Sequence, residues 1–110
     1  MPKYLVAASY TPEGLRGLAK DKASGRHAAA QKALAGVGGK LEAMYFAFGE
    51  TDVFIVFDCP DNISAASISL AVSATGLIRS KTIPLLSIEE VDQALSKSVT
   101  FSPPGSSAKP

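Results

Sequence analysis

Cysteine and histidine are almost missing from this sequence, which has one of each in 110 residues. The single cysteine, Cys59, excludes a disulfide within the chain and a metal site built from several cysteines. No spacing of His, Cys, Asp and Glu fits a zinc site, so we expect neither a metal nor a cofactor. A chain with so little cysteine has no need of an oxidising compartment, and we expect it in the cytoplasm.

Charge is scarce as well, because Asp, Glu, Lys and Arg make up 19% of the residues and the formal net charge is +1. No run of five or more basic residues occurs, so we expect no nucleic-acid partner. The N-terminal stretch MPKYLVAASY is too short an apolar run for a signal peptide, and no segment could span a bilayer. We therefore expect no membrane partner either.

Glycine-rich phosphate loops, nucleophile elbows and paired-carboxylate motifs are missing too. What the sequence does contain is a strongly apolar stretch from Gly38 to Asp61, GGKLEAMYFAFGETDVFIVFDCPD. Its two apolar runs, 41–48 and 53–57, flank a short turn that contains glycine. This pattern predicts a β-hairpin.

Helix and strand signals alternate along the rest of the chain. Thr11 and Pro12 mark a helix start, Pro60 ends the second hairpin strand, and Ser87 with Glu90 marks another helix start. The expected elements are strand 3–10, helix 12–37, strands 41–48 and 53–57, helix 63–75, strand 77–86 and a short helix 88–97. This βαββαβ order with a terminal helix predicts an α+β, ferredoxin-like fold: a four-stranded antiparallel sheet with two helices on one face.

The first helix is long for such a fold. About 25 residues span ~37 Å as a helix, whereas an eight-residue strand is ~27 Å long. We therefore expect a bend, most simply at Ser24-Gly25. We also expect one domain over residues 1–98 and a flexible tail, rich in Pro, Gly and Ser, over 99–110.

Both faces of the predicted hairpin are apolar. Alternation predicts one face with Leu41, Ala43, Tyr45 and Ala47 and an opposite face with Met44, Phe46 and Phe48. A four-stranded sheet with helices on one side and water on the other would alternate polar and apolar residues. We therefore expect a homo-oligomer, a dimer or a multiple of dimers, with the sheets stacked face to face.

Several short motifs resemble those of the GYD-domain family, in the dimeric α/β-barrel group. The segments that carry the resemblance are Lys3-Tyr4-Leu5, Tyr10-Thr11-Pro12-Glu13-Gly14, Gly38-Gly39-Lys40-Leu41-Glu42, Phe48-Gly49-Glu50-Thr51-Asp52-Val53, Pro60-Asp61, and Gly76 before Arg79. The family takes its name from a Gly, a Tyr and an Asp at the hairpin, and here Thr51 stands at the tyrosine position. The resemblance implies a ferredoxin-like dimer but no particular activity, because this group includes cofactor-free monooxygenases, isomerases and haem enzymes.

Five side chains are candidates for a site. His27, Tyr10 and Asp52 could serve in catalysis, and Arg26, His27 and Arg79 could bind a ligand. Each also fits a structural role: a boundary histidine, an aromatic at the helix start, a carboxylate closing the hairpin, and charges protecting an edge strand. We expect a pocket where the middle of the first helix, residues 24–27, faces the sheet, because the alanines around it leave space.

Three function classes stay open. The first is a small-molecule binding or sensing module that uses this pocket. The second is a small cofactor-independent oxygenase or isomerase using His27, Tyr10 and Asp52, and the third is a structural oligomeric subunit. The lack of a dense polar cluster favours the first.

Overall fold

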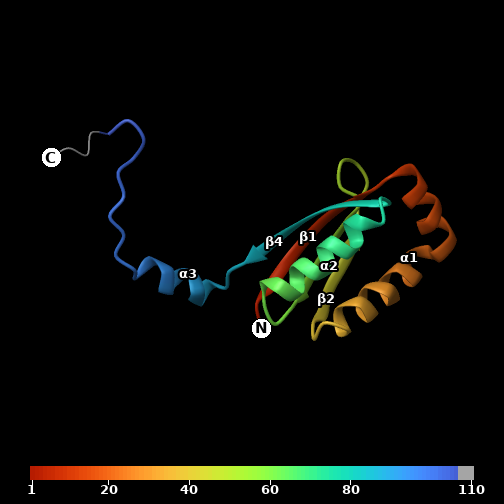
Figure 1. Ribbon diagram of the computed structural model, residues 1–110, viewed down its shortest axis with the longest axis horizontal. Coiled ribbons are helices and arrows are strands. Elements are labelled where there is room, and N and C mark those ends of the chain that lie inside the picture. The colour runs from red at the N-terminus through yellow and green to blue at the C-terminus, as the bar shows by residue number, and fades with distance from the viewer. Residues whose placement is uncertain (107–110) are drawn as a thin grey trace.

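The elements of the chain follow the predicted order (Figure 1). A computed structural model describes residues 1–106. Its elements are β1 (Lys3–Tyr10), α1 (Pro12–Ala35), β2 (Lys40–Phe46), β3 (Val53–Asp58), α2 (Asn62–Ala74), β4 (Ile78–Leu85) and α3 (Ile88–Leu95). The predicted ends agree with these bounds to within two residues.

The four strands form one antiparallel sheet in the order β2-β3-β1-β4, which fits a ferredoxin-like fold. Tyr4 of β1 and Phe57 of β3 stand opposite each other, and their rings stack with centroids 5.3 Å apart. Leu34 of α1 and Ala65 of α2 pack in the same buried cluster. Both helices therefore cover one face of the sheet, which we call the covered face; the other is the open face.

Cys59 also belongs to this buried cluster, directly after β3. Its exposed fraction is 0%, and burial raises the pKa of its thiol. Gly39 lets the chain pass close by, since a Cβ on it would lie 3.0 Å from the Cys59 Sγ and 2.7 Å from the Asp58 carbonyl oxygen. The start of β2 thus closes over the sulfur.

The predicted faces of β2 were wrong at one residue. Leu41 stands opposite Phe57, but Ala43 stands opposite Val56, so the register shifts between Leu41 and Ala43. A bulge of one extra residue turns Leu41 to the covered face, where it packs against the core. Past the bulge, Ala43 and Tyr45 share one face, as predicted, and that face is the open face.

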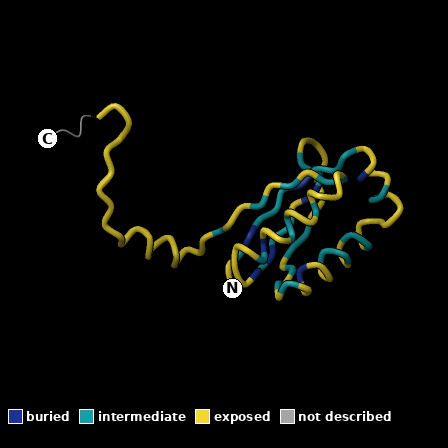
Figure 2. Tube along the Cα trace, viewed as in Figure 1, coloured by how far each residue is buried: buried dark blue, intermediate teal, exposed yellow. Residues whose placement is uncertain are grey.

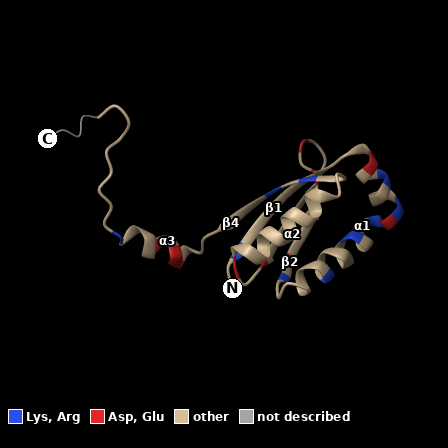
Figure 3. Cartoon of the chain, in the orientation of Figure 1, with Lys and Arg blue, Asp and Glu red and all other residues tan. Residues whose placement is uncertain are grey.

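The break in α1 lies earlier than Ser24-Gly25. Lys22 has φ 67° and ψ 164°, which separates two helical pieces. Arg26 Nη1 and Asp21 Oδ2 form an ion pair of 3.4 Å across the break. Gly25 stays helical and gives room for this contact, because a Cβ on it would lie 3.3 Å from the Asp21 Cβ. Charged residues gather on this first part of α1 (Figure 3).

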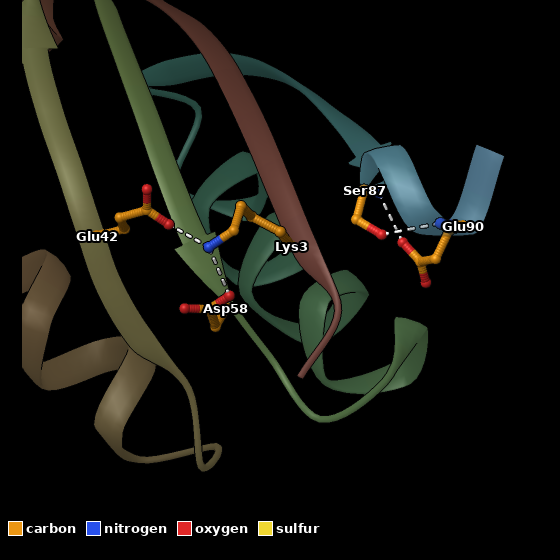
Figure 4. A network of polar contacts seen from close by, with 5 residues as sticks. All are labelled: Lys3, Glu42, Asp58, Ser87 and Glu90. Atoms are coloured by element: carbon orange, nitrogen blue, oxygen red, sulfur yellow. Dashed lines mark hydrogen bonds and ion pairs between the residues drawn. The ribbon is translucent and has the colours of Figure 1, made fainter. Parts of the chain in front are cut away.

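The open face has an apolar centre with charged residues at its border. Phe54 and Ile83 are each 39% exposed there, and Tyr45 is 72% exposed. Lys3, at one end of this face, donates hydrogen bonds to the carboxylates of Glu42 and Asp58 (Figure 4). The bond to Glu42, followed by that to Asp58, raises the pKa of Lys3.

α3 projects away from the sheet, and the residues from Leu86 to Ser106 are exposed throughout (Figure 2). A full capping box begins the helix: the Ser87 N–H donates to Glu90 Oε1 at 2.7 Å, and the Glu90 N–H donates to Ser87 Oγ at 3.0 Å (Figure 4). The tail predicted over 99–110 has no helix or strand as far as Ser106, and residues 107–110 lie outside the described part. Within residues 1–106, no helix has the length and apolar character needed to cross a membrane.

Candidate functional site

A cavity of about 130 Å³ lies between α1, α2 and the covered face of the sheet. Its walls are mostly apolar: α1 contributes alanines, α2 contributes Ile68 and Val72, and the sheet contributes Val6 and Ile55. The polar residues of the lining are Tyr10, Arg26, Ser69, Ser80 and Thr82. An apolar chamber with a few polar groups is the usual form of a small-molecule site.

Small side chains create this space. Ala29, Ala30 and Ala33 face the cavity from α1, and Ala8 faces it from the centre of the sheet. Each alanine ends at Cβ, so the two layers meet without filling the gap between them. The cavity therefore follows from the alanine-rich second piece of α1, but it extends to Ala33, and of the expected residues 24–27 only Arg26 is part of its described lining.

Ser80 brings an unused hydrogen-bonding group to this chamber. It lies on β4 opposite Ala8, and its Oγ is buried without a hydrogen-bond partner among the described residues. A buried hydroxyl left unpaired costs about 1–3 kcal/mol. Such a group is an exception in folded proteins and calls for a partner.

Arg26 brings the positive charge. Its side chain is 32% exposed, so it reaches from the cavity wall to solvent. The 3.4 Å distance to Asp21 Oδ2 is long for a charged hydrogen bond, which is ordinarily about 2.7–2.9 Å. Apart from Arg26, Tyr10 is the only side chain with an ionisable group in the described lining.

Tyr10 and Asp52 meet through the backbone of Tyr10 and the side chain of Asp52. The Tyr10 N–H donates to Asp52 Oδ2 at 2.8 Å, and the Asp52 N–H donates to the Ala8 carbonyl oxygen at 2.8 Å. Asp52 thus fastens the loop between β2 and β3 to the end of β1. Of the two residues, Tyr10 lines the cavity and Asp52 does not.

His27 and Arg79 lie away from the cavity. His27 is exposed and is not part of the lining, because it follows Arg26 and points about 100° around the helix from it. Arg79 is exposed and stands opposite Ser9 on the open face. The structure therefore gathers Arg26 and Tyr10 at the cavity and leaves His27, Asp52 and Arg79 outside its lining.

Three polar lining residues were not singled out from the sequence: Ser69 on α2, and Ser80 and Thr82 on β4. Ser80 and Thr82 alternate along β4 with Arg79 and Lys81, so a period of two already separates these two pairs. That alternation is the signal that could have found them. Within residues 1–106, no group of three or more His, Cys, Asp and Glu side chains could hold a metal ion.

Comparison with known proteins gives one match. A family model of the GYD domain matches residues 4–95, from β1 to the last residue of α3. Neither the curated proteins nor the solved structures give a significant match.

Proposed function

This chain belongs to the GYD-domain family, and we propose that it is an oligomeric binding or sensing module for a small molecule held in the cavity. One observation carries the proposal: a largely apolar cavity of about 130 Å³ whose described lining includes a few polar residues, Arg26 among them. A ligand with a polar end would fill the space and meet such a group.

The size of the cavity indicates the size of an occupant. An engineered apolar cavity of ~150 Å³ in another protein binds benzene. A molecule about as large as one aromatic ring is therefore the natural size for this site.

The open face supports the oligomer. Its apolar centre and charged border have the arrangement typical of protein–protein interfaces, which are dry and apolar in the middle and polar at the rim. A second copy presents the same surface and can cover it through a two-fold axis. We propose that two sheets stack in this way, as in a dimeric α/β barrel.

A cofactor-independent enzyme is the alternative class. It would have used His27, Tyr10 and Asp52, of which Tyr10 alone lines the cavity. The Asp52 carboxylate already accepts a backbone hydrogen bond, and His27 is exposed. We therefore propose binding rather than catalysis.

A titration with toluene tests the binding proposal. We expect the backbone amide NMR signals of cavity residues such as Ala30, Ser80 and Val72 to shift on adding millimolar toluene. In the Ala30→Leu variant the added side chain occupies the cavity, so these shifts disappear. Ala28 is exposed on the same helix and is not part of the lining, so Ala28→Leu is the matched control and keeps the shifts. A wild-type chain whose signals do not move would favour a purely structural subunit.

A further inference from the structure

We infer that the ligand is a small apolar carboxylic acid with about one ring, its ring in the cavity and its carboxylate on Arg26; this rests on the proposed function. The inference comes from where Arg26 lies and from the charge of the lining. It names the chemical class that this site fits.

Arg26 lies where the cavity meets solvent, because it is part of the lining and its side chain is 32% exposed. A ring held by the apolar walls would therefore place a polar substituent at this end of the cavity.

The charge of the lining selects an anion. Arg26 contributes a guanidinium, and no Asp or Glu lines the described cavity. A cationic ligand would find no carboxylate there and would lose its hydration without replacement. A carboxylate gains a charged donor from Arg26.

The free chain keeps Arg26 available for this role. Its contact with Asp21 Oδ2 is 3.4 Å long, and the Asp21 side chain is 48% exposed. Exchanging so weak a surface pair for a ligand carboxylate costs little. The apolar walls then hold the ring, while the guanidinium bridges the cavity and the solvent.

Three one-ring probes separate the inference from its premise: sodium benzoate, toluene and benzylamine. We expect benzoate to bind at least tenfold more tightly than toluene and benzylamine not to bind, by NMR titration of the full chain. Arg26→Gln should weaken benzoate about 10- to 100-fold while changing toluene less than twofold, because it removes one charge-assisted hydrogen bond. Arg16 is exposed on α1 and is not part of the lining, so Arg16→Gln is the control and should change neither affinity.

Each remaining outcome counts against a defined claim. If toluene binds but benzoate does not, or if Arg26→Gln weakens both equally, the carboxylate assignment is overturned and the binding site stands. If none of the probes binds, both the inference and the proposed function fail. Should Arg26→Gln disturb the fold, Arg26→Lys provides a second test, because it keeps the charge and still supplies charged donors. It should retain the affinity for benzoate within about tenfold. If Arg26→Lys binds toluene but not benzoate, the carboxylate assignment is overturned as well.

Discussion

Phe54 on the open face offers the sharpest test of the proposed dimer. A phenylalanine side chain buries about 150–250 Å², so the 39% that stays exposed in the single chain amounts to about 60–100 Å². Covering it by a second copy is worth ~2 kcal/mol per chain at about 25 cal/mol per Å². Phe54→Asp removes this gain and places a carboxylate where the partner would exclude water.

The cost doubles through symmetry. In a two-fold dimer each substitution occurs twice in the same interface. Even ~3 kcal/mol per chain for lost burial and an unpaired charge gives ~6 kcal/mol, which raises the Kd roughly 10⁴-fold. A dimer that is stable at nanomolar concentration would then dissociate at micromolar concentration.

Light scattering after gel filtration measures the result. We expect wild type at twice the chain mass of 11.4 kDa, or a multiple of that dimer, and Phe54→Asp at 11.4 kDa with the circular dichroism of a folded chain. Leu15 on α1 is 46% exposed and lies away from the open face, so Leu15→Asp is the matched control and should leave the assembly intact. A wild-type monomer at micromolar concentration, or a Phe54→Asp variant that keeps the wild-type mass, would refute the reasoning.

Three further predictions concern single residues. In urea titrations, Ala30→Leu should raise the free energy of unfolding by about 1–2 kcal/mol. Three added carbons fill the cavity at ~0.8 kcal/mol each, and the lost rotamer entropy of the side chain is subtracted from this gain. Ala28→Leu, the control, should change the free energy of unfolding by less than about 0.5 kcal/mol. Lys22→Gly should raise the urea midpoint of unfolding. A non-glycine residue at φ 67° and ψ 164° costs about 1–3 kcal/mol, which is more than the conformational entropy that glycine adds to the unfolded chain. A lower midpoint would contradict this strain. The backbone N–H of Ser64 lowers the pKa of Asp61, so this carboxylate stabilises the fold above about pH 4 and loses that effect as pH falls through its lowered pKa. The Tm of Asp61→Asn should therefore fall less than the Tm of wild type between pH 6 and pH 2. Equal falls in Tm would argue against the cap.

Local signals were sufficient to predict the elements. Thr11 accepts the Gly14 N–H at the start of α1, and Asp61 accepts the Ser64 N–H at the start of α2. Such caps depend on residues three apart, so the sequence alone contains them. The bulge at Leu41 has no mark of this kind, because pairing with β3 sets the register.

The cavity was predicted only in outline. Alanines in α1 indicated space, but the break at Lys22 resets the helical phase, so side-chain directions beyond it could not be extrapolated from the first piece. For this reason the sequence could not decide which of Arg26 and His27 faces the sheet. Predicting that Ser80 lines the cavity requires knowing which face of β4 the helices cover. That choice depends on contacts between distant parts of the chain. The direction of α3 is likewise beyond local signals, since its capping box fixes where the helix begins and not where it points.

The buried sulfur of Cys59 allows the rate at which the chain opens to be measured. A thiol reagent attacks the thiolate, and this thiol is fully covered with its pKa raised by burial, so labelling has to wait until the chain opens. Since the sequence holds one cysteine, each labelled molecule records one opening event. If assembly holds the chain closed, the labelling rate falls as protein concentration rises; if each chain opens alone, the rate is the same at every concentration.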